Sequence, residues 1–406
     1  MVVSTGSESE KYIAVGVAGS GTTLQDEELL RELSDLVSTA GGECIGTMVQ
    51  HLSRPDPVTY IGSGKAEELK RMLEVLEADA VVCDDELAPA QLKNLSDILD
   101  CKVIDRTMLI LDIFASRAKT REGKLQVETA QLKYRSTHLI GMGKALSRLG
   151  GGIGTRGPGE TKLESDRRVI QKRISKLEKD IAQLKRSRMV SRKERLSGRV
   201  PTVAIVGYTN AGKSTLLNSI TTAEVLAEDK LFATLDPTTR RTRMPGGKEI
   251  LFTDTVGFIN KLPHQLIDAF RSTLEEAKYA DVILHMVDAS DPEMDTKMKV
   301  VYDTLSELGI EGKSIITAFN KMDMADGDQT FVDVRATRCV RISARKRENL
   351  EELFEAIGEV LRDGKEYFEG LIRYDDQALL SEIRKYGQLL SEEYCEDGIY
   401  VKAYRG

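Results

Sequence analysis

The octapeptide Gly207–Ser214 (GYTNAGKS) limits the fold of this chain more than any other feature. It matches G-x-x-x-x-G-K-[ST], follows the apolar run at residues 203–206 and precedes a helix-forming segment at 215–220. Between a strand and a helix, this motif forms a loop whose backbone N–H groups surround phosphates. Lys213 would neutralise the β- and γ-phosphates, and the Ser214 hydroxyl would ligate Mg²⁺. The motif therefore predicts a nucleoside-triphosphate site in an α/β domain.

A second short motif, Asp254–Gly257 (DTVG), follows the apolar run at residues 250–252. Asp254 stands where a carboxylate would hold Mg²⁺ through water, and the Gly257 N–H would meet the γ-phosphate. Many strands end in a similar way, so the tetrapeptide is informative only because it lies downstream of the phosphate loop.

The base is indicated by Asn320–Asp323 (NKMD), which ends the apolar run at 315–319. The Asp323 carboxylate can accept hydrogen bonds from N1–H and the exocyclic amine of guanine, and adenine lacks both donors in that arrangement. Ser343 and Ala344, after the next strand-like run, would offer a backbone N–H to the guanine O6. These motifs in this order predict a GTPase that uses GTP/GDP and Mg²⁺.

A threonine that senses the γ-phosphate is expected between the phosphate loop and Asp254. Thr234, Thr238 and Thr239 are the candidates, and their spacing does not choose among them. Directly after D-x-x-G, Ras-like proteins place a glutamine that orients the attacking water, whereas this chain has Phe258. Since a phenyl ring cannot polarise water, we expect intrinsic hydrolysis on or below the order of 10⁻³ s⁻¹, accelerated by a partner.

The rest of the chain divides into three further parts. Residues 1–120 alternate between two hydrophobic periods, as in a small parallel α/β domain. Strands are expected there at 12–17, 44–49, 80–83 and 102–104, and helices at 25–39, 69–76 and 89–99. In the GTPase domain, residues 199–363, strands are expected at 203–206, 250–254, 282–287, 315–319 and 340–342. Residues 364–406 form a small acidic C-terminal segment with a helix.

Residues 121–198 carry leucine and isoleucine at heptad spacing, which is typical of a coiled coil. Because residues 141–160 contain eight glycines and one proline, we expect the ends of that stretch not to be helical. Residues 191–199 are expected to be a hinge. We predict a basic, antiparallel helical hairpin with a Gly-rich tip loop, and a flexible interdomain linker is the alternative.

The charge distribution indicates a polyanionic partner for the same region. The 406-residue chain has a net charge of −7, yet residues 151–200 hold 15 Lys and Arg against 6 Asp and Glu. Such a segment is a candidate for binding nucleic acid, although a solvated helix face would carry the same charges. The five cysteines form no C-x-x-C pair, the N-terminus has no signal-peptide pattern, and no apolar run reaches about 18 residues. We therefore expect a cytoplasmic protein with no membrane span.

Several segments resemble the HflX family of translation-factor-related GTPases. They are YIGSGK at residues 60–65, GGIGTRGPGETKLE at 151–164, GYTNAGKST at 207–215, FATLDPTTR at 232–240, DTVGFI at 254–259 and NKMD at 320–323. The resemblance covers roughly residues 10–361 and implies a cytoplasmic GTPase that associates with the large ribosomal subunit, acting in ribosome splitting or rescue. It also implies Thr234 as the threonine that ligates Mg²⁺, and ribosomal RNA as the partner of residues 141–199. Residues 364–406 match no motif of the family.

The expected fold is α/β, with a P-loop GTPase domain and a smaller N-terminal parallel α/β domain joined by an antiparallel coiled-coil helical hairpin, in a monomer. Lys213, Thr234 and Gly257 are the expected catalytic residues, and Ser214, Thr234 and Asp254 the expected metal ligands. The residues expected to contact the nucleotide are Gly207, Tyr208, Thr209, Asn210, Ala211, Gly212, Lys213, Ser214, Thr215, Phe232, Ala233, Thr234, Leu235, Asp236, Asp254, Thr255, Val256, Gly257, Asn320, Lys321, Met322, Asp323, Ser343 and Ala344.

Other readings fit parts of the same pattern. A GTP-dependent switch would recruit a protein through the coiled coil without RNA. A GTPase that assists RNA modification would need a catalytic cluster in residues 1–120, where no Cys/His/Asp cluster stands out. Gly62–Lys65 precedes a helix and would serve either as a second nucleotide site or as a helix cap with Lys65 in solvent.

Overall fold

The computed structural model describes residues 9–19, 23–149, 158–196, 200–221, 231–232, 235, 237–245, 247, 249–261, 276–325, 330–363, 366–386 and 388–405. The chain falls into two compact units. The first consists of Met1–Gln183, Lys230–Leu235 and Lys261–Phe270, and the second of Leu184–Asp229, Asp236–Asn260 and Arg271–Gly406. Each has its own hydrophobic core.

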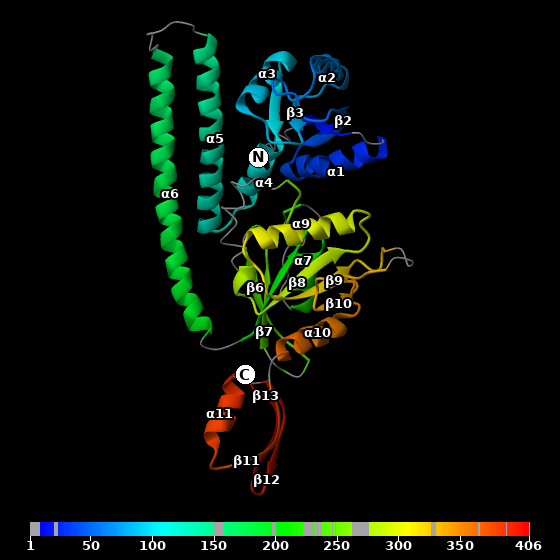
Figure 1. The fold of residues 1–406 in the computed structure, drawn as a ribbon, viewed down its shortest axis with the longest axis vertical. Coiled ribbons are helices and arrows are strands. Elements are labelled where there is room, and N and C mark those ends of the chain that lie inside the picture. Colours follow the sequence, from blue (N-terminus) through cyan, green and yellow to red (C-terminus); the bar gives the residue numbers. More distant parts are fainter. Residues whose placement is uncertain are drawn as a thin grey trace, which may run out of the picture. The chain divides into compact units, whose positions relative to one another are not determined.

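The first unit contains a parallel sheet of four strands in the order β2-β1-β3-β4 (Figure 1). The strands are β1 (Lys11–Ala18), β2 (Glu43–His51), β3 (Ala80–Cys83) and β4 (Lys102–Asp105). The helices are α1 (Thr23–Ala40), α2 (Ser63–Leu76), α3 (Pro89–Leu99) and α4 (Arg106–Arg117). Every residue of β3 is buried, as expected for a parallel strand covered on both faces. The predicted parallel sheet is confirmed, whereas α4 was not predicted.

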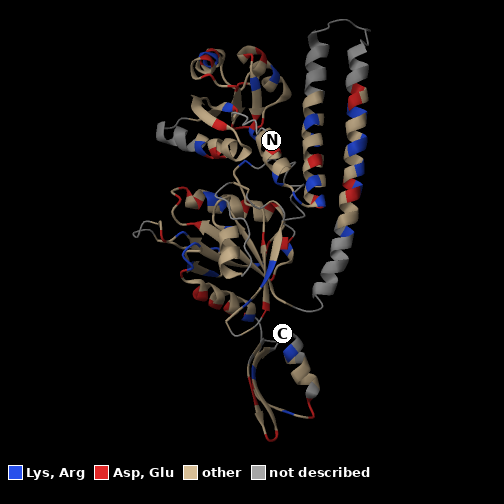
Figure 2. Ribbon diagram, turned by 180° about the vertical axis from the view of Figure 1, so that it is seen from behind, with Lys and Arg blue, Asp and Glu red and all other residues tan. Residues whose placement is uncertain are grey.

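Two long helices follow: α5 (Arg121–Leu149), which belongs to the first unit, and α6 (Pro158–Leu196), which belongs to it as far as Gln183. They lie side by side and run in opposite directions (Figures 1 and 2). Ion pairs of 2.7 Å from Arg173 to Glu128 and of 2.9 Å from Lys133 to Glu178 join them. Ile174 and Leu177 of the predicted seam are buried. A coiled-coil geometry and the linking role of the hairpin stay predictions.

Two expectations about this hairpin were wrong. The first and last residues of 141–160 are helical, since α5 continues to Leu149 and α6 begins at Pro158. Gly141 and Gly143 cost about 1 kcal/mol each in a helix interior, and the helix formers that follow outweigh this cost. Proline is favourable at the first position of a helix, where its missing N–H has no partner to lose. The expected hinge is helical as far as Leu196, because residues 191–196 are mostly good helix formers.

The second unit is built on a six-stranded sheet in the order β10-β9-β8-β5-β7-β6 (Figure 1). Its strands are β5 (Thr202–Gly207), β6 (Thr238–Arg243), β7 (Glu249–Asp254), β8 (Val282–Asp288), β9 (Ser314–Asn320) and β10 (Arg338–Arg341). The helices described between these strands and after β10 are α7 (Lys213–Ile220), α9 (Met294–Glu307) and α10 (Leu350–Arg362). All neighbours are parallel except β6, an antiparallel edge strand. The sequence of β6, TTRRTR, has no apolar run, so it was not predicted.

The C-terminal residues form a separate small sheet within the second unit. It consists of β11 (Glu366–Arg373), β12 (Gln388–Cys395) and β13 (Gly398–Arg405), antiparallel in the order β11-β13-β12, with helix α11 (Gln377–Tyr386). Its core contains Ile372, Ile383, Ile399, Val401 and Ala403. The sequence indicated the helix but not the strands. Within the described residues, no helix has the length and apolar composition needed to cross a bilayer.

Candidate nucleotide-binding site

The phosphate loop connects β5 to α7, and two glycines are required by its path. A Cβ on Gly207, at φ +153°, would lie 2.3 Å from the carbonyl oxygen of Met286. A Cβ on Gly212, at φ +92°, would lie 2.2 Å from the Asn320 side-chain nitrogen. Both positions therefore exclude larger residues, so that the backbone can curl tightly against β8 and β9.

Lys213, the first residue of α7, is buried with its ammonium inside the loop. Its Nζ donates hydrogen bonds to the carbonyl oxygens of Gly207 (3.1 Å) and Tyr208 (2.7 Å). Burial lowers the pKa of Lys213 to about 8, and the opposing effect of Asp254 is smaller. Because burial disfavours the charged form of Lys213, a nearby anion would stabilise the ammonium, and the residue is suited to bind an anionic ligand.

Ser214 of the phosphate loop and Asp254 of the D-x-x-G motif, which are both predicted to ligate Mg²⁺, lie close together. The Ser214 hydroxyl donates a 2.7 Å hydrogen bond to Oδ2 of Asp254, which is fully buried at the end of β7. One hydroxyl oxygen and one carboxylate are the donor types that Mg²⁺ accepts beside phosphate oxygens and water. These side chains fit the ion.

The base-recognition segment is tied to the phosphate loop by Asn320. Its Nδ2 donates to the carbonyl oxygen of Ala211 (2.9 Å), and its Oδ1 accepts from the N–H of Ala344 (2.9 Å). Asn320 is buried and joins three motifs, of which the phosphate loop lies 109 residues before it and Ala344 lies 24 residues after it. This bracing role was not apparent from the sequence, which indicated only a nucleotide contact.

Asp323 is held in place by Ser343, whose hydroxyl donates to Oδ1 at 2.8 Å. This hydrogen bond lowers the pKa of Asp323, so the carboxylate is ionised at neutral pH, as guanine recognition requires. Lys321, at φ +63°, directs its ammonium to Asp288 at 2.6 Å. The backbone N–H of Met322 donates to Ile342.

The residues after the D-x-x-G motif pair directly with the phosphate loop. The N–H of Thr209 donates to the carbonyl oxygen of Phe258 (2.8 Å), and the N–H of Phe258 donates to Gly207 (3.0 Å). Phe258 is buried. A Cβ on Gly257 would lie 3.0 Å from Lys213 Nζ, so the Gly257 backbone passes beside the ammonium that is predicted to contact the phosphates.

The remaining predicted residues are less closely associated with the site. Asn210 has φ +60° and is exposed, and Thr215 lies in the first turn of α7, two residues after Lys213. The Thr255 hydroxyl donates to Ile205 at 2.7 Å and Val256 is buried, so both side chains belong to the core.

Of residues 232–236, Phe232 and Leu235 are described, and both belong to the first unit, whereas the other candidate threonines, Thr238 and Thr239, begin β6 in the second unit. Phe232 packs edge-on against Phe114, with ring centroids 4.6 Å apart, and Leu235 is buried. Ala233, Thr234 and Asp236 lie outside the described residues. Their roles stay predictions.

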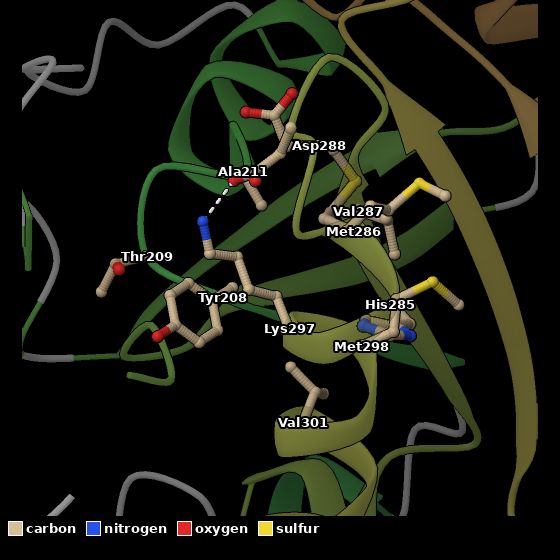
Figure 3. Close-up of a pocket in the computed structure, with 12 residues that line it drawn as sticks. Tyr208, Thr209, Ala211, His285, Met286, Val287, Asp288, Lys297, Met298 and Val301 are labelled. Carbon is tan, nitrogen blue, oxygen red and sulfur yellow. Dashed lines mark hydrogen bonds and ion pairs between the residues drawn. The ribbon is translucent and has the colours of Figure 1, made fainter. Parts of the chain in front are cut away.

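A small cavity lies behind the phosphate loop, between β8 and α9 (Figure 3). Its volume of about 20 Å³ has room for one water molecule and not for a nucleotide. His285 lines it, and burial lowers the pKa of His285 to about 4, so the ring is neutral. Tyr208 lies at its edge, with the ring facing α9 (Figure 3).

Gly62–Lys65, which the sequence offered as a second nucleotide site or a helix cap, does not resemble the phosphate loop. The N–H of Gly62 donates to the Gln50 side chain at 2.8 Å, and Lys65 pairs with Glu68 at 2.9 Å. Both groups are engaged within the domain, which fits the helix-cap reading of this segment.

Comparison with known proteins gives matches along most of the chain. Family models described as "GTP-binding GTPase N-terminal", "GTP-binding GTPase Middle Region" and "50S ribosome-binding GTPase" match residues 27–115, 117–195 and 202–321. A curated GTPase HflX from Lacrimispora saccharolytica is 57% identical over 397 residues, 98% of this chain and 94% of that protein. The chain belongs to the HflX family of GTPases.

A second curated relative supports the same family. GTPase HflX from Caldanaerobacter subterraneus subsp. tengcongensis is 49% identical over 98% of this chain and 91% of that protein. A crystal structure of a GTP-binding protein from the archaeon Sulfolobus solfataricus in complex with GDP is 27% identical, covering 86% of this chain and 98% of that one, with a TM-score of 0.45. As a member of this family of GTP-binding GTPases, the protein binds guanine nucleotides and hydrolyses GTP.

Proposed function

We propose that this protein is a Mg²⁺-dependent GTPase that docks on the large ribosomal subunit through residues 141–199, in the cytoplasm, and acts in ribosome splitting or rescue. The observation that carries the docking is a row of lysines on one exposed face of α6. Lys172, Lys176 and Lys179 line an open surface groove with Arg168, on the side of the helix away from the buried Ile174 and Leu177.

The lysine row suits a phosphate backbone. In the described part of the chain, Lys172, Lys176 and Lys179 form no ion pair, whereas Arg168 pairs with Glu164 at 2.7 Å. Residues three and four apart share a helix face about 5–6 Å apart. Figure 2 shows acidic residues among the basic ones on α6, so the row is a narrow stripe. Lysine neutralises phosphates without reading bases, which favours RNA shape over sequence. The family description "50S ribosome-binding GTPase" supports the same partner.

In the GTPase site, we assign Asp323 to the guanine base and Lys213 to the β- and γ-phosphates. Ser214, Asp254 and Thr234 would hold Mg²⁺, which when bound spreads the charge that develops between the β- and γ-phosphates. The Gly257 N–H would contact the γ-phosphate. Phe258 supplies no group that orients water, so a partner completes the hydrolytic site.

Steady-state GTP hydrolysis, alone and with purified large subunits at two salt concentrations, tests this proposal. We expect strong stimulation that declines as salt rises, because phosphate contacts release counterions. The double variant Lys172→Ala/Lys176→Ala should lose most of the stimulation. Lys278→Ala/Lys299→Ala removes two exposed lysines from other parts of the chain and is the matched control. Absence of stimulation at both salt concentrations would contradict ribosome docking and favour a switch that recruits a protein through the hairpin.

A further inference from the structure

Tyr208, the second residue of the phosphate loop, contacts the loop that follows D-x-x-G through its side chain. Its hydroxyl oxygen accepts a hydrogen bond of 2.7 Å from the backbone N–H of Asn260. Asn260 lies three residues after Gly257, and the intervening Phe258 pairs with the phosphate-loop backbone. The phosphate loop therefore holds the Gly257–Asn260 segment both through its backbone and through a phenol.

The Tyr208 ring is itself fixed from a third element. The ammonium of Lys297, on α9, lies 5.5 Å from the ring centroid, within range of a cation–π interaction. Lys297 is in turn ion-paired with Asp291 at 2.5 Å and Glu293 at 3.5 Å. Tyr208 is 8% exposed, so the ring has little freedom to move (Figure 3).

This arrangement bears on the position of Gly257. Its backbone passes beside Lys213 Nζ and Thr209, at the place where the γ-phosphate of GTP would extend. Only GTP has that phosphate, so a fixed conformation of the Gly257–Asn260 segment should raise the affinity for GTP and leave the affinity for GDP unchanged. A group that holds the segment in place before binding reduces the cost of ordering it.

We propose that Tyr208 is a positioning residue for GTP: its hydroxyl, with the ring held by Lys297, presets the Gly257–Asn260 segment for the γ-phosphate and so sets the preference for GTP over GDP. The inference rests on the proposed contact between Gly257 and the γ-phosphate. The tyrosine touches no reacting atom and acts through Gly257.

The test measures binding of fluorescent GDP and of a fluorescent non-hydrolysable GTP analogue to the full chain, with single-turnover hydrolysis of GTP. Tyr208→Phe should weaken binding of the analogue about 2- to 10-fold, as for one hydrogen bond, and leave GDP binding unchanged. Lys297→Met should act in the same direction by about two- to fivefold. The single-turnover rate should fall with analogue affinity.

Two comparisons keep the result interpretable. Tyr302→Phe removes another phenol of the same domain, bonded to Asp333 at 2.6 Å, and should leave the GTP-to-GDP preference unchanged. Gly257→Ala tests the underlying contact and should selectively weaken the analogue. If Gly257→Ala is selective but Tyr208→Phe weakens both nucleotides equally or neither, the role of Tyr208 is overturned. If Gly257→Ala is not selective either, the γ-phosphate contact itself is overturned.

Discussion

The Ser214 hydroxyl and the Asp254 carboxylate, 40 residues apart in sequence, share a hydrogen bond of 2.7 Å at the junction of α7 and β7. Because the hydroxyl supports a charged oxygen, Ser214→Ala should raise the Mg²⁺ concentration for half-maximal binding of a GTP analogue about tenfold or more. A Mg²⁺ titration checks this. Ser219→Ala, which removes a hydroxyl bonded to Leu216 in the same helix, is the control, and an unchanged Mg²⁺ requirement in Ser214→Ala would contradict the assignment.

Guanine selection is expected to depend on Asp323. Asp323→Asn replaces an acceptor with a group that can donate, so GTP affinity should fall by about 10²-fold or more while binding of xanthosine triphosphate increases. Competition binding with both nucleotides measures the exchange of preference. Asp375→Asn changes an exposed carboxylate elsewhere and should have no effect. Retained GTP affinity in Asp323→Asn would remove this residue from the base site.

The buried Lys213 makes stability and binding depend on pH in opposite senses. Its folded pKa of about 8 lies below the ordinary 10.5, so between these values the unfolded chain binds a proton that the folded chain lacks. The free energy of unfolding without nucleotide should therefore rise with pH across this window, and nucleotide affinity should fall above about pH 8. Urea unfolding at pH 7–10 tests the first effect. Lys213→Met should remove the pH-dependent rise and abolish nucleotide binding while still folding; a wild-type-like pH profile in this variant would contradict the attribution.

The packing of the phosphate loop against Asn320 can be tested at Gly212. Gly212→Ala introduces both a positive φ for alanine and a contact of 2.2 Å with the Asn320 amide, so it should lower Tm and abolish nucleotide binding. Gly309→Ala also has a positive φ, +66°, but no atom within 4 Å, and should cost only about 1 kcal/mol. Equal effects of the two changes on Tm and binding would show that the Asn320 contact is unimportant.

Intrinsic hydrolysis is expected to be slow because Phe258 occupies the position of the water-orienting glutamine. The ring is buried and its backbone pairs with Thr209 and Gly207, so Phe258→Gln should not create an efficient site by itself. Single-turnover measurements should give a rate on or below the order of 10⁻³ s⁻¹ without a partner. A rate near 1 s⁻¹ for the isolated protein would contradict this prediction.

Elements with a strong hydrophobic pattern could be predicted from the sequence, and those formed by tertiary contact could not. The strand Ala80–Cys83 and the helix Pro89–Leu99 have the predicted bounds, because each has a clear apolar pattern that is bounded by turn residues. β6 was missed since an edge strand needs no apolar run, and β11–β13 since their alternation is interrupted by charged residues.

The same distinction applies to the site. Short local motifs indicated the phosphate loop, the magnesium ligands and the base-recognition segment. The hydrogen bonds of Asn320 and of the Tyr208 hydroxyl were not predicted, because they join residues far apart in sequence. Neither residue type at its position signals such a bond, because the partner is a backbone group brought close by the sheet.

The single amide of Asn320 has a consequence for how the nucleotide leaves. One side chain braces the carbonyl of Ala211, beside the phosphates, and the N–H of Ala344, beside the base. A force applied to either loop is transmitted to the other through two hydrogen bonds of 2.9 Å. With guanine at Asp323 and phosphates at Lys213, as proposed, one connected frame would hold both ends of the nucleotide, and a partner that loosened the base end would also loosen the phosphate end.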